Sequence, residues 1–167
     1  LDTTGTTPGI GGIAHINTDS TLKMYGGTLH GTTATTRGGA VNLQMRAHLY
    51  AYGGTITAGT SPQGACVNVQ EPNSSLYLSG NATIDDIYCR YANKLTIDGA
   101  FTGKAYLTYD ATRVTDLGAN MVVGTLINNG SVAGADLYCT NGYAITTSGT
   151  NLKLIDPASE MRSMCPP

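Results

Sequence analysis

Short runs in which apolar and polar residues alternate return along the chain at a fixed spacing. Leu22, Leu49 and Leu76 open three such runs, LKMYGG, LYAYGG and LYLSGN, and neighbouring copies are 27 residues apart. Alternation over a few residues, followed by glycine or asparagine, is typical of a β-strand that ends in a turn. The repetition predicts a fold built from stacked copies of one unit.

Two further strand-like segments accompany each run. The upstream segment is GGIAHI at 11–16, GGAVNL at 38–43 and GACVNV at 64–69, and the downstream segment is GTLH, GTIT or ATID. Three short strands per period are typical of a parallel β-helix, in which each coil stacks on the last at about 4.8 Å. The alternative, a leucine-rich repeat, needs an L-x-x-L-x-L skeleton that these residues lack.

The alternation also assigns residues to the inner or outer face of each strand. The residues predicted to fill the core are Ala14, Ile16, Leu22, Met24, Leu29, Val41, Leu43, Leu49, Ala51, Ile56, Val67, Val69, Leu76, Leu78 and Ile84. Between them, His15, Asn42 and Asn68 form an outward column, which we expect to stabilise the stack as a side-chain ladder. Gly26 and Gly27 suit a tight corner after the second strand.

Downstream, the repeat shortens and then loosens. Residues 86–103 predict a shortened fourth coil whose inward residues are Ile87, Cys89, Leu95, Ile97 and Phe101. Strand-like segments continue to residue 155 and predict irregular coils that cap the stack. We therefore expect a single domain of about six coils. It comprises a lead-in at 1–10, regular coils at 11–104, irregular coils at 105–155 and a tail at 156–167.

Composition narrows the classes of function. Only 12% of the 167 residues are charged, the formal net charge is −2, and no apolar run reaches the roughly 18 residues of a membrane span. Nucleic-acid binding and membrane insertion are therefore not expected. With one Phe and no Trp, the core of an all-β fold must be small and aliphatic. The chain starts at Leu1, so we expect a mature product or an excised piece.

Four cysteines are present, and none belongs to a C-x-x-C motif or a Cys/His cluster that would indicate zinc. Four cysteines allow three disulfide pairings. The segments DIYC at 86–89 and DLYC at 136–139 match each other, so Cys89 and Cys139 are the first candidate pair. The alternative is that the cysteines are small buried apolar residues.

Residues 11 to 155 resemble β-helical repeat modules of large surface proteins from Gram-positive gut bacteria. The residues that match the repeat or its closing segment are Gly26, Gly27, Thr28, Gly31, Gly38, Gly39, Gly80, Asn81, Thr83, Ile87, Tyr88, Leu95, Ile97, Gly99 and Gly103. The resemblance implies a fold similar to pectate lyases, a right-handed parallel β-helix, in an exported or wall-attached module without catalytic residues. The cysteines depart from the pattern, since such modules usually lack them.

Tyrosines gather at the outward positions of the second strand. One column is Lys23, Tyr50 and Tyr77, and the next is Tyr25, Tyr52 and Ser79. Aromatic rings on a flat strip suit sugar rings or a protein partner, because they combine apolar area with a polar tip. The alternative is that the stacked tyrosines only stabilise neighbouring coils.

Enzymatic activity would require acidic residues grouped on one face, as in polysaccharide lyases and hydrolases of this fold. Asp85 and Asp86 with Arg90 are the best local group, and Asp98 is expected outward near the same edge. Adjacent strand residues face opposite ways, so the two neighbouring aspartates form a pair only if the strand breaks there. The alternative is an Asp-rich turn between coils, and we predict no enzyme activity.

The histidines give no metal-ligand spacing either. His15, His30 and His48 have no second ligand at a fixed distance in the sequence, so no metal and no cofactor are expected.

The sequence thus indicates a non-catalytic extracellular module, secreted or attached to a cell surface. Its expected role is adhesive or structural, and its expected partner is a glycan or a surface protein. Two alternatives stay open. One is a polysaccharide-binding or polysaccharide-degrading β-helix, and the other is a structural subunit that assembles end to end through open strand edges.

Overall fold

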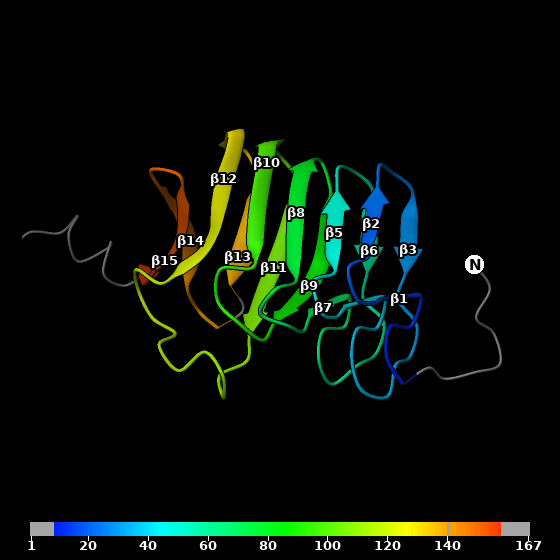
Figure 1. Ribbon diagram of the computed structural model, residues 1–167. Helices are drawn as coiled ribbons and strands as arrows, with labels where there is room; N and C mark the ends of the chain where they lie inside the picture. Colours follow the sequence, from blue (N-terminus) through cyan, green and yellow to red (C-terminus); the bar gives the residue numbers. More distant parts are fainter. Residues whose placement is uncertain (1–8, 140, 158–167) are drawn as a thin grey trace, which may run out of the picture.

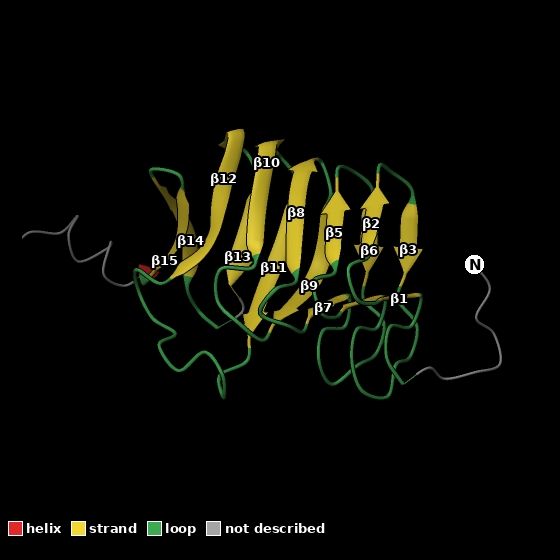
Figure 2. Cartoon of the chain, in the orientation of Figure 1, coloured by secondary structure: helices red, strands yellow, loops and turns green. Residues whose placement is uncertain are grey.

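The computed structural model describes residues 9–139 and 141–157, which form a sheet of 15 strands (Figures 1 and 2). The strands are β1 (Ala14–Ile16), β2 (Thr21–Met24), β3 (Thr28–His30), β4 (Val41–Leu43), β5 (His48–Ala51), β6 (Thr55–Thr57), β7 (Val67–Val69), β8 (Ser75–Gly80), β9 (Thr83–Cys89), β10 (Leu95–Phe101), β11 (Lys104–Tyr109), β12 (Val122–Ser131), β13 (Asp136–Cys139), β14 (Ala144–Ser148) and β15 (Asn151–Ile155). The all-β prediction is confirmed. Cys165 and most of the expected lead-in and tail lie outside the described residues.

Strands pair with the equivalent strand of the next period, in parallel and with like residues opposite each other. In β2, β5 and β8, Leu22 lies opposite Leu49, and Leu49 lies opposite Leu76. The column continues into β10, where Leu95 lies opposite Leu76. The constant 27-residue spacing sets this register, because a shift of one residue would turn every apolar side chain outward.

The sheet follows a path that nearly closes on itself. It passes through β1, β4, β7, β9, β11 and β13, crosses β14 and β15, and returns through β12, β10, β8 and β5 to β2. The crossing is antiparallel: β13 pairs with β14, β14 with β15, and β15 with β12. The segment expected to form irregular capping coils therefore ends in antiparallel strands that join the two sides of the sheet.

The two ends of the molecule differ in how their strand edges are paired. Among the described strands, β1, β2 and β3 each pair on one side only, with β4, β5 and β6, so their other edges are open. At the opposite end, β14 and β15 cover the edges of β13 and β12. Open edges that could accept a further strand are thus found at the β1–β3 end.

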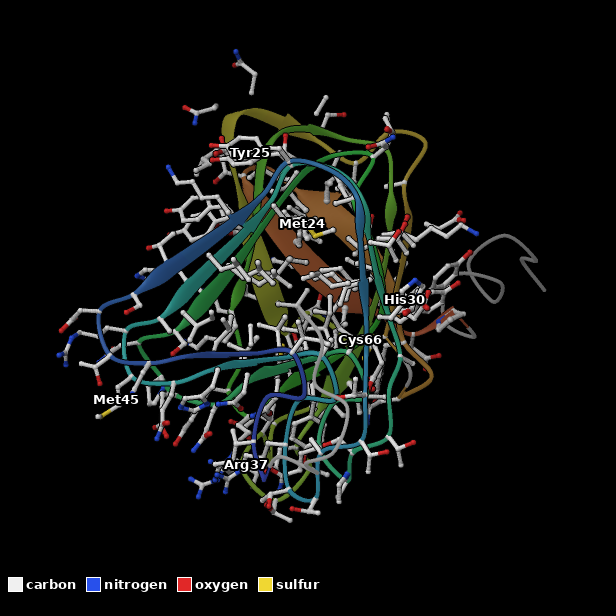
Figure 3. All side chains as sticks on the ribbon, turned by 90° about the vertical axis from the view of Figure 1, so that its right-hand side faces the viewer. Met24, Tyr25, His30, Arg37, Met45 and Cys66 are labelled. Atoms are coloured by element: carbon white, nitrogen blue, oxygen red, sulfur yellow. The ribbon has the colours of Figure 1, made fainter. Side chains whose placement is uncertain are left out.

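The predicted core lies where the alternation placed it. The inward residues of β4–β10 are almost completely buried, including Leu43, Leu49 and Phe101. The inward residues nearest the open end, such as Leu22 and Leu29, are only partly buried. Figure 3 shows this end of the molecule, with Met24 directed into the interior and Tyr25 at the outer surface.

Glycine is required at the corner between the second and third strands of the first two periods. Gly27 and Gly54 have φ angles of +83° and +87°, a region that side chains with a Cβ disfavour. A Cβ on Gly54 would also lie 2.5 Å from the carbonyl oxygen of Gly27 in the layer above. The repeated glycine therefore turns the chain and lets successive corners stack closely.

The expected outward column of His15, Asn42 and Asn68 forms a hydrogen-bonded ladder. The Asn68 Nδ2 donates to Asn42 Oδ1 at 2.6 Å, and the Asn42 Nδ2 lies 3.2 Å from His15 Nδ1. Both asparagines are completely buried within this ladder. A ladder buries its middle members, since each amide is covered by the side chains above and below it.

The predicted disulfide between Cys89 and Cys139 is wrong, because both cysteines are free and buried, as is Cys66. The two cysteines do point inward, but β11 lies between their strands. Cys89 is opposite Tyr109, whereas Cys139 is opposite Leu107. Two strand spacings of about 4.8 Å each exceed the roughly 7 Å between Cα atoms that a disulfide can span. The alternative of small buried apolar residues fits the three described cysteines.

Candidate functional site

The outer face of β2, β5 and β8 brings together all five residues predicted as a binding face. Register places Lys23 opposite Tyr50 and Tyr50 opposite Tyr77. Tyr25 and Tyr52 each follow the last residue of β2 and β5 and occupy the adjacent column. We call these five residues the tyrosine strip.

The four rings of the tyrosine strip form one connected aromatic group. The centroids of Tyr50 and Tyr77 are 4.1 Å apart, with 6° between the ring planes. Tyr25 and Tyr52 stack at 5.1 Å and 13°. Tyr50 and Tyr52 join the two columns at 6.1 Å and 24°. Because the side-chain period of a strand is two, Tyr50 of β5 and Tyr52, two residues further on, place their rings on the same face.

This stacking decides which parts of the rings a partner can reach. The face of Tyr50 is covered by Tyr77, and the ammonium of Lys23 lies 5.8 Å from the Tyr50 centroid, as in a cation–π contact. Over the two columns, the surface therefore consists mainly of ring edges and phenol hydroxyls. Tyr25 is the most exposed of the four rings, at 73%, since it ends its column at the open end of the sheet.

The surroundings of Tyr50 favour the neutral form of its phenol. Burial raises the pKa of Tyr50 above its ordinary value, and the hydrogen bond with Tyr77 and the nearby carboxylate of Asp98 act in the same direction. His48 meets the edge of the Tyr77 ring at 6.0 Å and 73°. The strip therefore presents phenol hydroxyls that can donate and accept hydrogen bonds, with Lys23 at the end of the Tyr50 column.

Two neighbours of the strip were not recognised as such from the sequence. His48 lies two residues before Tyr50, so the period-two pattern could have placed it on the same face. Asp98 was expected near Asp85 and Asp86, but it follows Ile97, which lies opposite Leu78, and so continues the column of Tyr52 and Ser79. That placement depends on the pairing of β10 with β8, which the shortened fourth period obscures.

The acidic group considered for catalysis is not assembled in one place. Asp85 and Asp86 both lie between the inward residues Ile84 and Ile87, which pair with Ala105 and Leu107 across a register shift. Two residues of β9 thus oppose one of β11, as in a β-bulge, so the strand is interrupted at the two aspartates.

The residues considered for catalysis lie in different environments. Asp86 accepts hydrogen bonds from the Ala65 backbone N–H at 2.6 Å and Thr108 Oγ1 at 3.3 Å, and burial raises its pKa. Arg90 lies away from it, with its Nε 3.9 Å from Asp110 Oδ2. Asp98 accepts from Asn128 on the side of the sheet that carries the tyrosine strip.

Asp110, the residue that follows β11, is held by hydrogen bonds from its neighbours. Burial alone would raise its pKa, but hydrogen bonds from Thr112 and Tyr88 and the charge of Arg90 outweigh burial and lower it. Asp110 Oδ1 accepts from both the backbone N–H and the hydroxyl of Thr112, which caps the turn after β11. These contacts give Asp110 a structural role.

No group of three or more metal-ligating side chains occurs in residues 9–139 and 141–157. The three histidines lie on different strands. His15 contacts Asn42, His30 lies 3.2 Å from the hydroxyl of Thr57, and His48 contacts Tyr77.

Comparison of the chain with protein-family models, curated proteins and solved structures found no match. In the part of the chain that the structure describes, no helix has the length and apolar character needed to cross a membrane.

Proposed function

We propose that the chain is a non-catalytic extracellular module that binds a partner through the tyrosine strip. In this proposal the fold is a right-handed parallel β-helix of about six coils with three short strands per coil. The 27-residue period and the in-register parallel pairing of equivalent strands support it. The surface-protein repeats that the sequence resembles supply the expectation of secretion or attachment to a cell surface.

One observation carries the binding role: the aromatic stack extends beyond what packing requires. Tyr50 and Tyr77 cover each other, so their contact can be explained by stability alone. Tyr25 covers Tyr52 with one face, but it remains 73% exposed. Exposed aromatic side chains that belong to a larger aromatic surface mark interaction sites, where a rigid ring and a hydroxyl contact a partner together.

The test is binding of the intact chain to an array of glycans and to cell-surface protein extracts from candidate hosts. Tyr25→Ala and Tyr50→Ala should each weaken a detected interaction. Tyr138→Ala is the matched control, because Tyr138 is 48% exposed and stacks on Tyr106 at 5.4 Å, outside the strip. Equal binding by all three variants would show that the strip only stabilises the fold.

Self-assembly is a second candidate, supported by the open edges of β1, β2 and β3. Since the opposite end is covered by β14 and β15, a second copy would meet this one through the same end, giving a closed pair. Sedimentation over a wide range of protein concentration tests this candidate. A monomer throughout, or long filaments, would contradict a closed pair.

A further inference from the structure

The tyrosine strip ends abruptly on the side away from β2. In the column of Tyr25 and Tyr52, the next residue along the stack is Ser79, which follows Leu78 of β8. Asp98 of β10 comes after it, directly after Ile97 and at the start of the register shift between β8 and β10. In the other column, Tyr77 is followed by Thr96. In both columns the tyrosine rings are therefore followed by short side chains with a hydroxyl group, Ser79 in one and Thr96 in the other. We call this place the Ser79 step.

At the Ser79 step, one ring of the strip has no aromatic neighbour on its second face. Tyr52 stacks on Tyr25 on the side of β2, and Tyr50 lies beside it on the same strand. On the side of β8 its neighbour in the column is the short side chain of Ser79. Tyr52 therefore has one ring face that no other ring of the strip covers, whereas the corresponding face of Tyr50 is covered by Tyr77.

Across the step lies a carboxylate held in position. Asp98 Oδ1 accepts a hydrogen bond from Asn128 Nδ2 at 2.7 Å. Among the described residues, no hydrogen-bond partner of the second carboxylate oxygen is found. The carboxylate of Asp98 also contributes to the raised pKa of Tyr50, after burial and the contact with Tyr77.

The separation of these groups fits a saturated ring. Tyr52 and Asp98 lie two strand spacings apart, about 9.6 Å at 4.8 Å per spacing. A ring packed on Tyr52 needs about 4 Å of contact distance, and a hydroxyl bonded to Asp98 needs about 2.8 Å. The remaining distance of about 2.8 Å suits a hydroxyl group that projects from the sugar ring toward Asp98, above the short side chain of Ser79.

We propose that the Ser79 step binds one sugar ring of a neutral or amino-sugar glycan. This inference rests on the proposed function of the strip and names its ligand class. The C–H face of the sugar packs on Tyr52, and its hydroxyl groups donate to Asp98 and exchange hydrogen bonds with Ser79. A carboxylate at the site repels uronic acids, so acidic polymers such as pectin bind less well than neutral ones.

The experiment uses the full chain and immobilised hexasaccharides of glucose, mannose and N-acetylglucosamine, with oligogalacturonate as the acidic comparison. Ser79→Tyr should place a further ring on Tyr52, extend the stack without disturbing the core, and lower binding at least tenfold. Asp98→Asn keeps the acceptor for Asn128 but removes the charge. It should weaken neutral-sugar binding and reduce discrimination against oligogalacturonate.

The variants separate failure of this inference from failure of the proposed function. If Ser79→Tyr binds like the unaltered chain while Tyr25→Ala and Tyr50→Ala bind less, the strip binds its partner elsewhere and the sugar site is refuted. If none of these variants changes binding, the strip itself has no binding role. Preference for oligogalacturonate over neutral sugars would also overturn the assignment. Thermal unfolding of each variant verifies that the fold is intact.

Discussion

Substitution of three leucines in one interior column tests how completely each layer of the fold is buried. Leu22, Leu49 and Leu76 lie opposite one another in β2, β5 and β8, so Leu→Ala makes the same chemical change in three successive layers. Leu49 and Leu76 are completely buried, whereas Leu22 is only partly buried at the open end. The comparison therefore isolates burial from residue type.

The expected losses follow from the cavity that each truncation leaves. A buried Leu→Ala change costs about 3 kcal/mol, because apolar contact is lost and the surrounding core closes only in part. We expect about that loss at Leu49 and Leu76. At Leu22, part of the side chain already contacts water and no closed cavity forms, so we expect about 1.5 kcal/mol.

Urea unfolding followed by far-ultraviolet circular dichroism measures the three free energies. The urea dependence must be the same in all variants, since a change would indicate that layers unfold separately. An equal loss of unfolding free energy at Leu22 and Leu49 would contradict an open β1–β3 end. It would mean that something covers this layer in solution. A smaller loss at Leu49 than at Leu22 would refute the stacking order itself.

The remaining predictions concern single buried sites. A thiol reagent near pH 8 should label none of the three described cysteines in the folded chain and all of them in urea, because burial raises the pKa of Cys66 and Cys89 to about 12. Burial raises the pKa of Asp86, so the chain should lose stability as the pH rises through that pKa, and Asp86→Asn should remove this slope in urea titrations from about pH 4 to 7. Gly39→Ala should lower the melting temperature strongly, because its Cβ would overlap a backbone carbonyl, whereas Gly26→Ala, whose Cβ meets open space, should not.

The parts of the fold that follow the period could be predicted from the sequence. Constant spacing fixes which residues are opposite each other, so the core columns and the tyrosine strip emerge from alternation and a count of residues. The same argument placed Lys23 beside Tyr50 and predicted the Asn42–Asn68 ladder. It did not predict their burial, because exposure depends on neighbours in adjacent layers as well as on direction.

The parts that the sequence did not predict lie where the period is interrupted. At Asp85 and Asp86, strand β9 continues through a corner, pairing first with β6 and then with β7, and the bulge arises there. After residue 110 the spacing has no fixed value, so nothing in the sequence indicated the antiparallel pairing of β14 with β15. The disulfide prediction failed for the same reason, since it assumed that two matching segments lie in adjacent layers.

The different pairing of the two ends has a consequence for how such a chain can change in length. The antiparallel strands fix one end, so a further 27-residue copy fits by insertion among the stacked periods or by addition beside β1, β2 and β3. Each copy would lengthen the stack by about 4.8 Å and leave the other pairings in place. A copy of the segment LYAYGG would also add two rings to the tyrosine strip. In the proposed function, the number of repeats would then set the number of contacts offered to a partner, so avidity would change by duplication without altering any existing contact.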